Sequence, residues 1–259
     1  MSKIKFSIFD TLIVSFLFIF VVSFPFDYFS SFLPTYGILL LKIIFRIFLL
    51  GYSLKIIIQN NISFGKINFR NIALFIPFLI ACFTNLISVL FNNSYIFTSS
   101  FDIKLFLEII IVILTAINEE IVFRLFVYNS LKIQNRLLKI LAGAAIFGAF
   151  HLLNLISPSF VTLLPIVLLQ SVYTFGLGLI LCFIYEFGFS LIPCIIYHFI
   201  FNFFNQLFVT KIMIVYQDNY AYIIIAVVVS LVLATYGLLL YFLKFKKENN
   251  SLSSNQYFD

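Results

Sequence analysis

The chain has 259 residues, of which 63% are hydrophobic and only 10% are charged, and its formal net charge is +6. This composition excludes an ordinary soluble domain and favours a single integral membrane domain. The three cysteines include no CxxC pair, so their spacing predicts no disulfide framework.

Long apolar runs, separated by short polar breaks, follow one another along the chain. A helix that spans a bilayer needs about 20 mainly apolar residues, and a backbone in lipid must pair its own polar groups. Breaks such as Pro34, Asn60-Asn61 and Ser157-Pro158 contain residues that end helices. We therefore predict an all-α membrane protein, a bundle of about eight transmembrane helices, with spans at residues 6–26, 34–58, 72–91, 103–130, 138–156, 160–184, 188–208 and 220–243.

The lysines and arginines predict how these helices are oriented. Basic residues concentrate on the cytoplasmic side of membrane proteins, so both termini are expected in the cytoplasm. The basic ends are then anchors near anionic lipid, and no nucleic-acid surface is expected. The predicted inner segments carry Lys3, Lys5, Lys66, Arg70, Lys132, Arg136, Lys139, Lys244, Lys246 and Lys247, against Lys104 and Lys211 outside.

The fourth run contains charged residues where lipid should surround the helix. A charged group at the centre of a membrane helix costs at least about 2.5–3.5 kcal/mol on insertion scales, so such residues usually serve a function. Glu120 and Arg124 are four residues apart, which predicts an ion pair on one helix face. Glu119 has no such partner, and it shares a stripe with Glu108 and Thr115. The alternative is a buried salt-bridge network that only holds helices together.

The two histidines of the chain also lie in apolar runs. His151 follows a face rich in glycine and alanine in the fifth run, and His198 precedes Asn202 by one turn in the seventh. Taken singly, each could be a hydrogen-bonding contact between helices. In the predicted topology, however, Glu119, His151 and His198 all lie about 15–20 Å from the cytoplasmic surface, near mid-membrane. This shared depth predicts one buried site.

Three short motifs at these positions resemble those of a known family. They are E-E-I-V-F-R at 119–124, F-G-A-F-H at 147–151 and H-F-I-F-N at 198–202. They are similar to the EExxxR, FxxxH and HxxxN motifs of the CPBP family, which comprises Rce1-type CAAX prenyl endopeptidases and bacteriocin-processing or immunity proteins with the Abi domain. The resemblance divides the chain into N-terminal helices without a family signature (1–101), a catalytic core (102–208), a final transmembrane helix (209–247) and a disordered polar tail (248–259).

The resemblance implies an intramembrane endopeptidase of the glutamate type. Glu119 would be the general base that activates water, and His151 would help to orient that water. His198 and Asn202 would stabilise the oxyanion, while Glu120 and Arg124 would form a supporting ion pair. We expect no required cofactor; the alternative is a zinc ion held by Glu119, His151 and His198, with an open position for water.

The expected partner is a hydrophobic peptide or membrane-protein substrate, such as a bacteriocin or pheromone precursor. The expected location is a bacterial cell membrane, crossed several times. One alternative is a self-immunity protein that cleaves or binds a bacteriocin. Another is a proton-coupled transporter that relays protons through its glutamate and histidine residues. A transporter of that kind predicts inverted repeats or paired broken helices, and the sequence shows neither.

Overall fold

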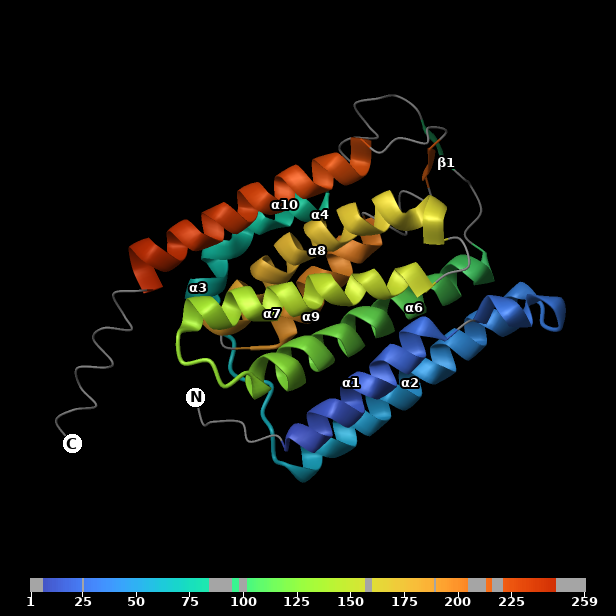
Figure 1. Ribbon diagram of the computed structural model, residues 1–259, viewed down its shortest axis with the longest axis horizontal. Helices are drawn as coiled ribbons and strands as arrows, with labels where there is room; N and C mark the ends of the chain where they lie inside the picture. The colour runs from blue at the N-terminus through green and yellow to red at the C-terminus, as the bar shows by residue number, and fades with distance from the viewer. Residues whose placement is uncertain are drawn as a thin grey trace.

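The computed structural model describes residues 7–24, 26–83, 95–97, 102–156, 160–188, 190–204, 213–215 and 221–245. Most of these residues are helical, which confirms the predicted all-α class. The exception is a pair of short antiparallel strands, β1 (Tyr95–Phe97) and β2 (Met213–Val215), at one end of the bundle (Figure 1). The predicted tail, 248–259, lies outside the described residues.

Two N-terminal helices form one side of the bundle. α1 (Ile8–Ser23) and α2 (Thr35–Gln59) pack side by side, joined by a 3-10 helix, η1 (Phe26–Ser31). Ser7 caps α1, because its Oγ accepts a hydrogen bond of 3.0 Å from the Asp10 amide. α2 in turn packs along α6 (Ile103–Glu120), which connects this helical pair to the rest of the molecule (Figure 1).

The third predicted span, 72–91, is wrong as a continuous helix in its described part. The chain instead forms three short pieces, α3 (Phe69–Ile72), the 3-10 helix η2 (Ala73–Phe78) and α4 (Leu79–Cys82). Pro77 lies inside η2. Proline has no amide hydrogen and its ring clashes with the preceding turn, so an uninterrupted α-helix is disfavoured there.

The remaining helices form the centre and the opposite side of the bundle. α7 packs on α8, α8 on α10, and α6 on α9 (Figure 1). A 3-10 helix extends α7, and a π-helical turn extends α10. The bounds are α7 (Arg136–Phe150) with η4 (His151–Ile156), α8 (Phe160–Gly188), α9 (Ile192–Asn202), and α10 (Ala221–Leu240) with η6 (Tyr241–Phe245).

After the last residue of α6, Glu120, the chain continues directly as a wider π-helix, η3 (Ile121–Tyr128). A π-helix bonds each amide to the carbonyl five residues earlier; it is rare and is frequently found at functional sites. The side chain of Asn129 closes this wide segment. Its Nδ2 donates to the carbonyls of Arg124 and Leu125, at 3.2 and 2.9 Å, and to the Tyr185 hydroxyl at 2.8 Å.

Close packing of α7 on α8 depends on the small residues that the sequence analysis noted. A Cβ on Gly148 would lie 2.9 Å from the Ser171 carbonyl oxygen and 3.0 Å from the Phe175 Cβ. The Ser171 hydroxyl also donates a 2.8 Å hydrogen bond to the Gly148 carbonyl. This contact holds the end of α7, and therefore His151, against α8.

The surface of the described residues fits a membrane environment. Three helices are long and apolar enough to cross a bilayer, Thr35–Gln59, Arg136–Leu155 and Val167–Gly188. Shorter apolar helices lie at Ile8–Val22, Ile192–Asn202 and Val227–Leu243. Large apolar side chains on these helices are exposed, as at Ile58 and Leu243, both 72% accessible. An apolar surface of this extent is typical of a protein in contact with lipid.

Candidate active site

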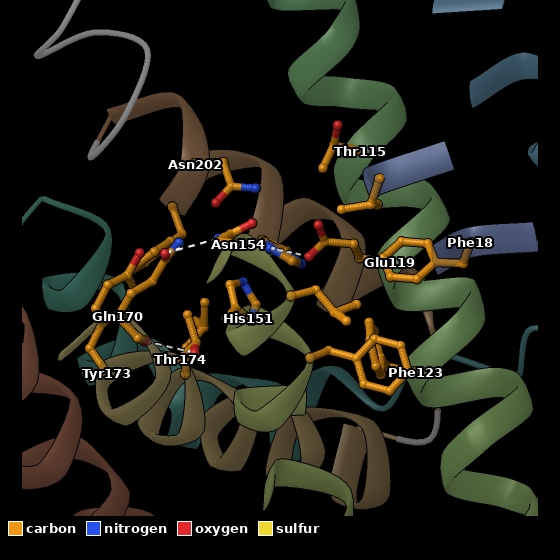
Figure 2. Close-up of a pocket in the computed structure, with 16 residues that line it drawn as sticks. Phe18, Thr115, Glu119, Phe123, His151, Asn154, Gln170, Tyr173, Thr174 and Asn202 are labelled. Atoms are coloured by element: carbon orange, nitrogen blue, oxygen red, sulfur yellow. Dashed lines mark hydrogen bonds and ion pairs between the residues drawn. The ribbon is translucent and has the colours of Figure 1, made fainter. Parts of the chain in front are cut away.

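A cavity of about 180 Å³ brings together four of the residues that the motifs had singled out. Glu119 reaches it from the last turn of α6, His151 from the start of η4, and His198 and Asn202 from α9. Figure 2 shows the side chains of Glu119, His151 and Asn202 converging on one space. Asn205, three residues after Asn202 in the sequence, lies outside the described residues.

The two neighbouring glutamates have different surroundings. The Glu119 side chain is 13% exposed and faces the cavity. Glu120 is fully buried and points away, with its Oε2 3.1 Å from the Arg124 Nε. The Arg124 guanidinium, also fully buried, lies over the Phe147 ring at 4.7 Å. Successive residues of a helix point about 100° apart, so Glu119 lines the cavity while Glu120 forms the buried ion pair.

His198 lies between the two carboxylates. Its Nδ1 is 2.7 Å from the Glu120 Oε1, and its Nε2 is 3.5 Å from the Glu119 Oε2. A carboxylate accepts hydrogen bonds, so Nδ1 donates to Glu120 and carries a hydrogen. A neutral ring would then place the lone pair of Nε2 opposite a Glu119 oxygen. The imidazole therefore connects the buried carboxylate of Glu120 to the carboxylate of Glu119 that faces the cavity.

His151 is oriented by its own helix. The sequence predicted it within a continuous helix, but it caps the C-terminus of α7 and begins η4. Its Nδ1 lies 3.0 Å from the Phe147 carbonyl oxygen, which can only accept, so Nδ1 donates and Nε2 is the acceptor of the neutral ring. The Phe147 ring packs edge-on against both histidines, with centroids 5.1 Å from His151 and 5.9 Å from His198.

The cavity also has polar walls that the motifs do not include. Thr115 lies one turn before Glu119 on α6, on the stripe that the sequence analysis identified. Asn154 donates a 3.0 Å hydrogen bond to the Gln170 side chain at the cavity edge. Gln170 and Thr174 of α8 were missed, although two polar residues four apart in an apolar run are a signal of a buried polar face.

The zinc alternative names Glu119, His151 and His198 as ligands. Among the residues that the structure describes, no three His, Cys, Asp or Glu side chains are grouped so that they could hold a metal ion. Both histidines use Nδ1 for hydrogen bonds within the protein, as histidine zinc ligands also do, and the Nε2 of His198 lies 3.5 Å from the Glu119 Oε2. The expectation that no cofactor is required stays a prediction, which chelation of the protein tests.

Comparison with known proteins agrees with the motif resemblance. Residues 100–204 match the family described as Rce1-like: Type II CAAX prenyl endopeptidase Rce1-like, and this range contains the glutamates, Arg124, both histidines and Asn202. Neither curated proteins nor solved structures give a match. The predicted resemblance to the CPBP family is thus confirmed for this part of the chain, because residues 100–204 match the Rce1-like family.

Proposed function

We propose that this chain is an intramembrane endopeptidase that hydrolyses a hydrophobic or membrane-associated peptide with a water molecule activated by Glu119. The observation that carries the proposal is the convergence of Glu119, His151, His198 and Asn202 on one cavity. The Rce1-like domain supports protease activity at the level of the family.

In this mechanism Glu119 removes a proton from water as the water oxygen attacks the scissile carbonyl carbon. The Nε2 of His151, left as an acceptor by the bond of Nδ1 to Phe147, orients the water. The new C–O bond produces a tetrahedral oxyanion. When the C–N bond breaks, the proton held by Glu119 passes to the leaving amine.

His198 and Asn202 stabilise the oxyanion in the proposed mechanism. Glu120 fixes the His198 ring through Nδ1, so Nε2 is the ring nitrogen that remains for the cavity. With His198 protonated, Nε2–H donates to the oxyanion, and the amide of Asn202 donates beside it. Donors that are already in place contribute most in a site with little water. The ion pair of Glu120 with Arg124 holds the Glu120 carboxylate in place for this contact.

The walls of the cavity suit an extended hydrophobic peptide. Phe18 and Phe123 supply apolar surface, whereas Asn154 and Gln170 supply amides that can bind a peptide backbone. We propose that the substrate is a membrane-associated peptide, such as a bacteriocin or pheromone precursor. We also propose a multi-pass arrangement in a bacterial cell membrane, with eight spans and both termini in the cytoplasm.

The test uses the purified full chain in proteoliposomes with a panel of synthetic single-span peptides and a farnesylated CAAX peptide. Products are identified by mass spectrometry. Glu119→Gln should lower the rate about 10²–10⁴-fold, because a general base is lost. Glu108→Gln is the matched control, a half-buried glutamate of the same helix that does not line the cavity, and it should cleave at the wild-type rate.

Two outcomes would contradict the proposal. One is a Glu119→Gln protein that cleaves as fast as wild type, which would remove Glu119 from the chemistry. The other is an activity that disappears with a chelator and returns with zinc, which would move the histidines into ligand roles. Since the proposed mechanism requires no metal, cleavage should continue after chelation.

A further inference from the structure

Asn154 and Gln170 form a pair of amides at the edge of the candidate active site. The Asn154 Nδ2 donates a 3.0 Å hydrogen bond to the Gln170 Oε1, and both side chains line the cavity. Gln170 belongs to α8, within the stretch Val167–Gly188 that can cross a membrane. A polar side chain in such a helix usually serves a function. The three motifs of the sequence include neither residue, so they give the pair no role.

The hydrogen bond between the two amides leaves one end of each unused. Among the residues that the structure describes, the Asn154 Oδ1 and the Gln170 Nε2 have no hydrogen-bond partner. An amide oxygen accepts hydrogen bonds and an amide nitrogen donates them, so the pair offers one acceptor beside one donor. One residue of an extended peptide has the complementary groups, because its N–H and C=O point to the same edge of the strand.

A helical segment could not use this pair of amides. In the interior of an α-helix each N–H and each C=O is already bonded within the helix, and in lipid these bonds are kept. An extended segment has the same groups free along its edges, and main-chain hydrogen bonds then supply affinity. The pair therefore favours a bound segment whose backbone is extended.

The 3-10 geometry of η4 determines where the pair lies relative to His151. In a 3-10 helix, side chains three residues apart lie one above the other, and each residue rises by about 2.0 Å. Asn154 follows His151 by three residues in η4, so it lies on the same face about 6 Å further along. An extended chain advances about 3.3 Å per residue, so 6 Å corresponds to about two residues of a bound peptide.

The cavity has an aromatic wall opposite the amides. The Phe123 ring packs edge-on against Phe18 and Phe150, with centroids 5.3 and 4.8 Å apart. In Figure 2, Phe18 and Phe123 lie on one side of Glu119, and Asn154 and Gln170 lie on the other. Side chains of an extended segment alternate between its two faces. A peptide can therefore place its backbone at the amides and a large apolar side chain at the rings.

We propose that Asn154 and Gln170 form a substrate-binding subsite, which holds the backbone of an extended segment about two residues from the cleaved bond. This inference deepens the proposed function and rests on it. It assigns the class of substrate: a membrane-associated peptide that is not helical where it is cleaved and has a large apolar side chain close to that bond.

The first experiment removes single backbone N–H groups from a peptide that the wild-type chain cleaves in proteoliposomes. Each member of the series carries one methylated backbone nitrogen, on either side of the cleaved bond, which is itself unmodified. In the wild type, methylation about two residues from this bond should raise KM about tenfold with little change in kcat, since a hydrogen bond is lost and its acceptor is left unpaired. In Asn154→Leu the same methylation should change KM less than about twofold, because the acceptor is already absent.

Two further variants separate the subsite from the rest of the wall. Gln170→Leu should raise KM for the unmodified peptide about tenfold with little change in kcat, because the donor is lost. Thr174→Val is the matched control, one turn further along α8 in the same cavity wall. The Thr174 hydroxyl is already bonded to the carbonyls of Gln170 and Ser171, at 2.8 and 3.1 Å, so this variant should keep the full effect of methylation.

The second experiment compares two peptides that differ only beside the cleaved bond, where one has Gly-Gly and the other Ala-Ala. Glycine disfavours a helix relative to alanine, so the Gly-Gly peptide should be cleaved with a kcat/KM about tenfold higher. Equal kcat/KM values would contradict an extended substrate and overturn the inference.

The outcomes distinguish this inference from the proposed function. If the wild type cleaves a peptide but no methylation raises KM, or if the effect is as large in Asn154→Leu or is absent in Thr174→Val, the inference fails alone. If the wild type cleaves no peptide, the proposed function fails, and binding of the same series with a fluorescent label decides the inference. A position-dependent loss of affinity that Asn154→Leu abolishes would support it. No binding, or binding that methylation does not change, would overturn it.

Discussion

The ion pair of Glu120 and Arg124 gives a direct test of how the site is supported. Both side chains are fully buried, with Nε and Oε2 3.1 Å apart. Removing one partner of such a pair leaves an uncompensated charge and typically costs about 3–5 kcal/mol. Glu120→Ala and Arg124→Ala should each be destabilised by about this amount. The double variant leaves no unpaired buried charge. Its loss of unfolding free energy should therefore be smaller than the sum of the two single losses, by about 2 kcal/mol or more.

The composition of the chain determines the assay. It has no tryptophan for intrinsic fluorescence, but its three cysteines are free and buried. A dye that becomes fluorescent on reaction with thiols therefore reports unfolding of the detergent-solubilised protein. At about 2–4 °C per kcal/mol for a protein of this size, each single variant should melt about 6–20 °C below wild type.

A second pair serves as the control. Arg136 Nε lies 3.2 Å from Glu186 Oε1, but the Arg136 side chain is 41% exposed. Because one partner of this pair is exposed to solvent, the Arg136→Ala and Glu186→Ala cycle should show a smaller coupling than the cycle of Glu120 and Arg124. Additive effects of the Glu120 and Arg124 substitutions, within about 0.5 kcal/mol, would refute a direct buried pair.

Three further results are expected. Asn202→Ala should lower kcat about 10²–10³-fold with little change in KM, because an oxyanion donor acts on the transition state; a raised KM at constant kcat would instead assign Asn202 to binding. Gly148→Ala should lower the melting temperature, since its Cβ would lie 2.9 Å from the Ser171 carbonyl oxygen; an unchanged melt would mean that α7 and α8 can separate without cost. Reporter fusions at residue 250 and in the 92–102 segment should report opposite sides of the membrane, and a C-terminus outside the cytoplasm would contradict the predicted topology.

Contacts within one helix could be predicted from the sequence, and shared depth placed Glu119, His151 and His198 at one site. Individual side-chain contacts between helices could not be predicted. The spacing of Glu120 and Arg124 fixes their relation, since residues four apart share a helix face. The hydrogen bond of Arg46 to Thr115 depends on how α2 and α6 are rotated against each other. The spacing of residues in the sequence does not predict this rotation. Local breaks were missed for a similar reason. Composition predicted a helix over 72–91, but Pro77 divides its described part into short turns.

The π-helix that follows Glu120 makes this part of the chain sensitive to its length. On one side, Asn118 ties α6 to the backbone of α2. On the other, Tyr128 donates a 3.0 Å hydrogen bond to Glu186, and Asn129 is bound to Tyr185. The additional residue of the wide turn is held between these two anchors. Loss of one residue there would turn everything beyond it by about 100° and break the anchors, so this segment tolerates a change of side chain far better than a change of register.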